Sequence, residues 1–149
     1  PYRIKVTGRT KHHINVFGEE LIIENAETAL RKASQLTNAE IVDYTAAPIF
    51  MNGKEKGAHE WIIEFKSPPD DLNSFTQLLD SALQEVNSDY EAKRFNNTTL
   101  NAPKIHHARE RLFYDWLKEK NKLGGQHKVP RLSNTRDYLE ELLTLNRSF

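Results

Sequence analysis

The chain of 149 residues is 38% hydrophobic and 28% charged, which is typical of one globular domain with its own core. Its 21 Lys and Arg residues balance 21 Asp and Glu residues. A nucleic-acid partner is therefore not expected, because phosphate binding usually needs a basic surplus. The chain has no cysteine, which excludes disulfides and thiolate metal sites. It shows no apolar run of membrane-spanning length and no secretory signal, so we expect a cytoplasmic protein with no membrane partner.

The N-terminal residues predict two short strands. Apolar and basic residues alternate over residues 2–7, which favours a strand, and a second strand is expected over residues 13–17 after a turn. Because the first residue is Pro1 and not methionine, we interpret the sequence as a segment of a longer protein. Part of a functional site could then lie outside it.

A helix is predicted after the second strand. Apolar residues recur there at intervals of three or four positions as far as a break at Thr37-Asn38. These residues are Ile22, Ala26, Ala29, Leu30 and Ala33.

A β-hairpin is predicted next, with arms over residues 40–50 and 58–66. The Asn52-Gly53 pair and Gly57 supply the loop between the arms. In the second arm one face carries His59, Trp61, Ile63 and Phe65, and the opposite face carries Glu60, Glu64 and Lys66. This alternation indicates one buried face and one polar face.

The second half of the chain is predicted to be mainly helical. Asp70 or Asp71 caps a helix that reaches Val86. A weaker extended stretch follows near residues 98–106, and a helix is expected around residues 107–120. Two further residues, Ser133 or Asn134, are candidate caps for a last helix that carries Tyr138, Leu142 and Leu145.

These elements predict a single α+β domain in the order β-β-α-β-β-α-β-α-α. A small mixed or antiparallel sheet with helices packed on one side of it buries such a set of apolar faces economically. The sequence shows neither an internal repeat nor a low-complexity tract.

The first candidate site is the turn that contains Gly8. A glycine lets the backbone approach a ligand closely, and Arg9 and Lys11 bracket this one with positive charge. A solvated hairpin tip would have the same residues. Gly18, with two glutamates behind it, is interpreted as a turn into the start of a helix.

Two pairs of histidines, His12-His13 and His106-His107, raise the question of a metal. Adjacent residues of a strand point to opposite faces, so neither pair is suited to chelate one ion. We therefore predict no metal site.

The segment NSDYEAKR, residues 87–94, concentrates charge at the end of a predicted helix. A general acid–base pair could be built from such residues. The alternative, which we favour, is a set of local ion pairs that holds the helix end against the next segment.

The strongest candidate is the basic loop KLGGQHKVPRLSN, residues 122–134. Gly124 and Gly125 permit unusual backbone angles, and Pro130 holds the preceding residue extended. Lys128 is a compact mobile charge, whereas Arg131 is a planar fork that can grip a carboxylate or a phosphate. A surface turn between two helices is the alternative interpretation.

Together these segments resemble a known family. The stretches GRTKHHINVFGEELIIENAE, NAEIVDYTAAPIF, GAHEWIIEF, NSDYEAKR and KLGGQHKVPRLSN are similar to the C-terminal domain of the auxin-responsive acyl-acid amido synthetases. These are acyl-adenylate-forming enzymes, and the form of the GRTKHH segment resembles bacterial-type members. The resemblance covers residues 1–149, which would be the C-terminal lid domain of a larger enzyme whose N-terminal domain is not in this sequence.

The resemblance implies a ligase that works in two steps. ATP, with Mg²⁺, and a carboxylic acid give an acyl-adenylate, and an amino acid then takes the acyl group and releases AMP. The N-terminal domain would carry most of the pocket for the nucleotide and the acid. In the family motif Gln-x-Lys-x-Pro-Arg, matched from Gln126 to Arg131, the lysine enters the active site. Lys128 is therefore the expected catalytic residue, and Arg9, Lys11 and Arg131 are expected to bind nucleotide or phosphate.

The sequence leaves two other functions open. The first is a related adenylating enzyme that passes the acyl group to coenzyme A. The second is a non-catalytic protein-binding module, in which the basic loop is only part of the surface. Neither the acid nor the acceptor is specified by these residues.

Overall fold

The computed structural model describes residues 13–95, 99–120 and 129–147. At its centre is a three-stranded sheet in the order β3-β4-β5, formed by β3 (Glu40–Ile49), β4 (Ala58–Ser67) and β5 (Lys104–Ala108). β3 and β4 are antiparallel, whereas β4 and β5 are parallel. The predicted hairpin and the mixed sheet are thus confirmed.

A second, two-stranded sheet precedes it. β1 (His13–Ile14) pairs antiparallel with β2 (Leu21–Ile22). The strand expected over residues 13–17 therefore lasts only two residues, because the chain turns at Gly18, whose φ of +81° favours glycine. The strand predicted over residues 2–7 lies outside the described residues.

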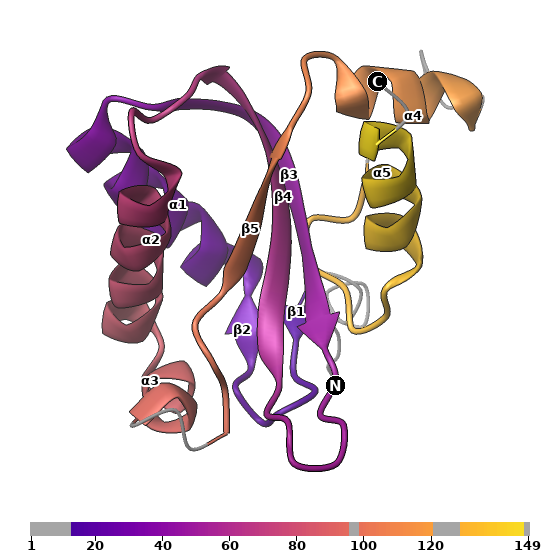
Figure 1. Cartoon of the computed structure of the whole chain (residues 1–149). Coiled ribbons are helices and arrows are strands. Elements are labelled where there is room, and N and C mark those ends of the chain that lie inside the picture. Colours follow the sequence, from indigo (N-terminus) through magenta and orange to yellow (C-terminus); the bar gives the residue numbers. More distant parts are fainter. Residues whose placement is uncertain (1–12, 96–98, 121–128, 148–149) are drawn as a thin grey trace, which may run out of the picture.

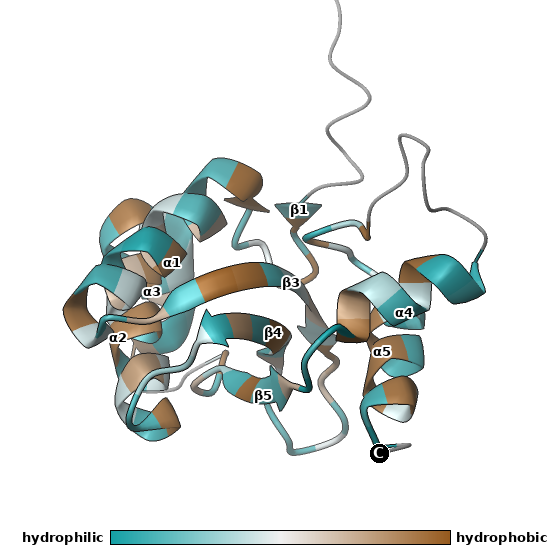
Figure 2. Cartoon of the chain, turned by 90° about the horizontal axis from the view of Figure 1, so that it is seen from above, coloured by the Kyte–Doolittle hydropathy of each residue, from teal (hydrophilic) through white to brown (hydrophobic). Residues whose placement is uncertain are grey.

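Helices cover both faces of the three-stranded sheet, so the expectation that they pack on one side is wrong. α1 (Ile23–Thr37), α2 (Leu72–Val86) and α3 (Ser88–Arg94) lie on one side, and α4 (Leu112–Glu119) and α5 (Asp137–Arg147) lie on the other (Figure 1). The view from above shows the sheet between these two groups (Figure 2). The short α3 is also one helix more than the predicted order contained.

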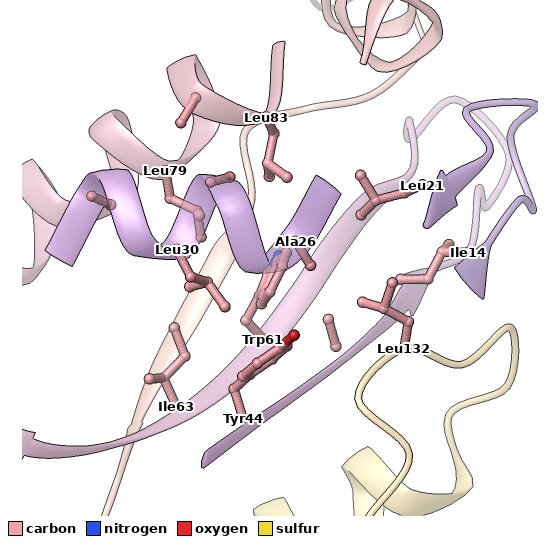
Figure 3. Packing of buried hydrophobic residues seen from close by; sticks show 14 of the residues in the cluster. Ile14, Leu21, Ala26, Leu30, Tyr44, Trp61, Ile63, Leu79, Leu83 and Leu132 are labelled. Atoms are coloured by element: carbon pink, nitrogen blue, oxygen red, sulfur yellow. The ribbon is translucent and has the colours of Figure 1, made fainter. Parts of the chain in front are cut away.

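Burial of β4 on both faces explains the difference. Trp61 and Ile63 belong to the core beneath α1 and α2, whereas Ile62 belongs to a second core with α4 and α5. Figure 3 shows the first of these cores, with Trp61 and Ile63 facing Ala26 and Leu30 of α1 (Figure 3).

The glutamates that suggested a solvent face are themselves buried. Glu60 and Glu64 are each only 5% exposed. Glu64 accepts hydrogen bonds from the backbone N–H groups of Arg111 and Phe113 at 2.9 and 3.2 Å, so its carboxylate caps α4. Such a bonded carboxylate is tolerated in a core, and the polar alternation of β4 therefore does not mark a surface.

The predicted helix boundaries are partly confirmed. Asp71 caps α2, since its side chain accepts from Asn73 N at 3.0 Å. The last helix begins at Asp137, later than expected. Asn134 does not cap it but joins the N-terminal sheet, donating to His13 O and accepting from Asn15 N. Ser133 Oγ accepts from Thr135 N, within the turn that precedes the helix.

Candidate functional site

The C-terminal part of the basic loop is bound to the edge of β3. Ala46 N donates to Arg131 O at 2.9 Å, and Ser133 N donates back to Ala46 O at 3.2 Å. The hydroxyl of Thr45 donates to Pro130 O at 2.5 Å. These bonds form a parallel bridge between Ala46 and Leu132, so the segment extends the sheet as a minimal extra strand.

Two buried side chains anchor the same segment in both cores. Leu132 is fully buried in the core beneath α1, where it lies beside Ile14 (Figure 3). Val129 is 4% exposed and belongs to the core of α4 and α5. Lys128, Gly124 and Gly125 lie outside the described residues. The chain is therefore held firmly from the residue directly after Lys128 onward.

Arg131 faces α1 and β3. Its guanidinium lies over the Tyr44 ring at 5.2 Å, 3.4 Å from Glu27 and 3.5 Å from Asp43, and the Tyr44 hydroxyl donates to Glu27. Burial, together with the neighbouring Glu27 carboxylate, raises the pKa of Tyr44, so this hydroxyl stays a hydrogen-bond donor. The role of Arg131 as a phosphate ligand remains a prediction, because here its partners are carboxylates.

Burial also raises the pKa of the Asp43 carboxyl, although the Tyr44 backbone N–H and Arg131 act in the opposite direction. The hydrogen bond from Tyr44 N measures 2.9 Å. Asp43 thus lies in a partly dry environment.

A buried contact between a carboxyl group and a histidine joins the β1–β2 turn to β4. Glu19 Oε2 and His59 Nε2 are 2.5 Å apart, and both side chains are fully buried. Glu19 Oε1 also accepts from Phe17 N at 2.8 Å. This pair was not predicted from the sequence. The histidine on the apolar face of a strand was the available signal, and Arg9 and Lys11, the candidates in the preceding segment, lie outside the described residues.

The charged segment 87–94 contains α3 and its cap Asn87, and the interpretation that it holds a helix end in place is confirmed by an ion pair and a hydrogen bond to Asp80 of α2. Arg94 Nη2 lies 2.6 Å from Asp80 Oδ2, and the buried hydroxyl of Tyr90 donates to Asp80 Oδ1 at 2.7 Å. Burial and the Asp80 carboxylate raise the pKa of Tyr90. Asp80 therefore ties α2 to α3, which is a structural role.

The adjacent histidines His106 and His107 have different partners. His106 Nε2 lies 2.6 Å from Glu60 Oε2, whereas His107 packs edge-on against the Phe65 ring. Among residues 13–95, 99–120 and 129–147, no three His, Asp or Glu side chains are grouped as ligands for a metal ion. Within the same ranges no helix is both long and apolar enough to cross a membrane.

The comparison with protein families decides the classification. Residues 24–137 match the model of the GH3 family C-terminal domain. The chain belongs to the GH3 family. The match includes Lys128, Pro130 and Arg131 but not Arg9 or Lys11, so the basic loop lies within the matched GH3 domain whereas the Gly8 turn lies outside it.

Solved structures show the same fold. The structure described as "AtGH3.15 acyl acid amido synthetase in complex with 2,4-DB" superposes with a TM-score of 0.70 over 96% of this GH3 chain, at 16% identity. A second, "GH3.15 acyl acid amido synthetase", gives a TM-score of 0.69 over 93% of it, at 18% identity. The chain spans 26% of the length of each. A comparison with curated proteins gave no match.

The hydrogen bond from the Thr45 hydroxyl to Pro130 O offers a test of how residues 129–133 are held against β3. We expect Thr45→Val to lower the free energy of unfolding by about 1–3 kcal/mol, because the carbonyl of Pro130, in a partly buried contact, loses this donor. Urea denaturation measures this loss. Thr28→Val, on the exposed side of α1, is the matched control and should cost less than about 0.5 kcal/mol. Equal losses in the two variants would show that the hydrogen bond is not a significant anchor.

Proposed function

We propose that this GH3 domain is the C-terminal lid of an ATP-dependent acyl acid amido synthetase that adenylates a carboxylic acid and joins it to an amino acid. The observation that carries the proposal is the family match over residues 24–137, which includes the basic loop. The likeness in fold to two acyl acid amido synthetases supports it. In this proposal ATP and Mg²⁺ are bound mainly by the N-terminal domain of the same protein, and the enzyme is cytoplasmic.

The chemistry gives Lys128 its role. In the first step a carboxylate oxygen attacks the α-phosphorus of ATP and pyrophosphate leaves. In the second the amine attacks the acyl carbon, AMP leaves and the amine loses a proton. Negative charge accumulates on the phosphates in the first step, and a positioned ammonium in a water-poor cleft stabilises it.

The fold supports a lysine that moves with the domain. Val129 and Leu132 are buried in the two cores, and Arg131 O and Ser133 N bond to Ala46 of β3. A rotation of the whole domain would therefore carry the base of the basic loop as a rigid unit. A residue delivered in this way can be present for one half-reaction and withdrawn for the other.

We expect the isolated 149-residue chain to be inactive and to bind ATP weakly. It supplies cationic side chains, but the pocket for adenine and acid is assigned to the N-terminal domain, and exposed charges are screened at physiological salt. The measurements are ATP–pyrophosphate exchange and an ATP titration in moderate salt. Exchange by the isolated chain, or micromolar affinity for ATP, would show that the chain holds a complete nucleotide site.

The full-length enzyme tests the reaction itself. Incubation with ATP, a panel of carboxylic acids and a mixture of amino acids should yield an amide, AMP and pyrophosphate, which mass spectrometry identifies. A parallel reaction with coenzyme A separates the two acceptors. A thioester as the sole product would replace the proposed function by that of an acyl-CoA ligase.

A further inference from the structure

Residues 131–134, here called the bridging segment, are bonded to both sheets of the domain. On one side the backbone of this segment pairs with Ala46 of β3. On the other side the Asn134 amide bonds to β1, since its Nδ2 donates to His13 O at 3.1 Å and its Oδ1 accepts from Asn15 N at 2.8 Å. The two-stranded sheet is therefore joined to the three-stranded sheet through the bridging segment.

The Asn134 amide has the hydrogen-bond pattern of a neighbouring parallel strand. In a parallel pair one residue bonds to the two residues that flank its partner, and the amide bonds to His13 and Asn15, which flank Ile14. Ala46 bonds in the same way around Leu132. A side-chain amide can do this because it offers both a donor and an acceptor. Its partners lie 121 and 119 residues away along the chain.

Buried apolar side chains reinforce the contact between β1 and the bridging segment. Ile14 and Leu132 are both fully buried and belong to the core beneath α1. Figure 3 shows the two side chains beside each other (Figure 3). Asn15 Oδ1 also accepts from Glu20 N at 3.0 Å, which fixes the turn between β1 and β2. A shift of β1 against the bridging segment would disturb these contacts together.

The two sides of this contact have distinct places in the proposed enzyme, on which the inference rests. The bridging segment begins three positions after Lys128. The N-terminal domain precedes β1 in the chain of the proposed enzyme, so β1 lies where the chain enters the C-terminal domain. The Asn134 amide thus links this point of entry to the segment that carries the expected catalytic lysine.

We propose that Asn134 is a positioning residue for acyl-adenylate formation and acts through Lys128. Its amide fixes β1 against the bridging segment, so that a rotation transmitted through β1 brings Lys128 to the same point in every cycle. Misplacement of a reacting or stabilising group by about 1 Å can slow a reaction about a hundredfold. The second half-reaction does not use Lys128 and therefore does not depend on Asn134.

Single-turnover kinetics of the full-length enzyme tests this role. Asn134→Ala should slow acyl-adenylate formation by about ten- to a hundredfold, because the lysine is less precisely placed. Conversion of pre-formed acyl-adenylate to amide should keep a near-normal rate. Unchanged adenylate formation would overturn the proposal, and so would equal slowing of both steps.

A double-mutant cycle tests whether Asn134 acts through Lys128. Once Lys128→Ala has removed the ammonium group, adding Asn134→Ala should slow adenylate formation no further than about twofold, because residues that act as a unit are not additive. Multiplication of the two single effects in the double variant would show that Asn134 acts independently of Lys128 and would overturn the proposal.

Asn146 of α5 provides a matched control. Its Oδ1 accepts from Arg109 N at 2.8 Å and its Nδ2 donates to His107 O at 3.5 Å. This amide therefore has the same pattern of bonds as Asn134, but at the end of α5 that is remote from the bridging segment. Asn146→Ala should leave adenylate formation near its normal rate. A loss equal to that in Asn134→Ala would reflect general loosening of the domain and overturn the proposal.

Hydrogen exchange in the isolated 149-residue chain tests the contact without any catalysis. Asn134→Ala should speed exchange of the Asn15 N–H about tenfold or more and leave the amides of α2 unchanged, because the loss of one acceptor opens the structure only locally. Unchanged exchange at Asn15 would overturn the proposal. An unmodified full-length enzyme that forms no acyl-adenylate would remove the proposed function and the catalytic role of Asn134 together. A working enzyme with an unchanged rate in Asn134→Ala would remove that role alone.

Discussion

Lys128→Ala in the full-length enzyme should slow acyl-adenylate formation by about two to three orders of magnitude, the usual scale for loss of one preorganised group that stabilises transition-state charge. The effect belongs to the first half-reaction, in which charge develops on the phosphates. Folding should be almost unchanged, because lysine is rarely a core residue, and replacing a residue outside the core usually costs less than about 0.5 kcal/mol. Single-turnover measurement of acyl-adenylate formation gives the rate directly.

Two comparisons make this result specific. Lys128→Arg should restore activity only in part, because a larger forked cation does not place its charge at the same point. Lys122→Ala, at the other end of the same basic loop, is the control and should leave the rate within a few-fold of the unmodified enzyme.

The second half-reaction shows whether Lys128 acts in the chemistry of the first step or supports both steps. Pre-formed acyl-adenylate should be converted to amide by the Lys128→Ala variant at a near-normal rate, since this step needs an amine and not charge on pyrophosphate. If both steps slow equally, Lys128 serves domain closure or substrate binding. If neither slows, the basic loop is only a surface turn.

His59→Leu should lower the free energy of unfolding by about 3–5 kcal/mol, because it leaves the Glu19 carboxylate buried without its cationic or donor partner. Leucine fills most of the volume, so the loss reports the Glu19–His59 contact more than a cavity. Urea denaturation followed by tryptophan fluorescence measures it. Adding Glu19→Gln should recover part of the loss, because the uncompensated charge disappears.

His106→Leu is the matched control for this pair. His106 contacts Glu60 at 2.6 Å but is partly exposed, and Glu60 keeps Arg136 at 2.8 Å. Burial raises the pKa of Glu60, but the bonds from His106 and Arg136 outweigh it and hold this pKa below its usual value. Since one strong partner remains, the loss should stay at about 1–2 kcal/mol. Equal losses of unfolding free energy in His59→Leu and His106→Leu would show that the cost of removing the histidine does not depend on how deeply its contact with the glutamate is buried.

The sequence by itself determined the local elements and the family. Alternation over residues 58–66 and the Asn52-Gly53 turn predicted the hairpin of β3 and β4, and helical spacing with an aspartate cap predicted α2. These signals are short-range, because they depend on which side chains neighbour each other along a helix or strand. The family followed from the order of several short segments along the whole chain.

Only the tertiary structure decided what each polar side chain does. Glu60 and Glu64 suggested a solvent face, yet each is buried. Their burial is possible because hydrogen-bond partners reach them from segments 46 to 76 residues away. The Glu19–His59 pair spans 40 residues, and Arg131 meets Glu27 across 104. A buried charge is stable only when it is paired or hydrogen-bonded, and in these cases distant segments supply the partners. Spacing along the chain cannot show such a partner, so the second helical layer and the surroundings of Arg131 emerged only from the folded arrangement.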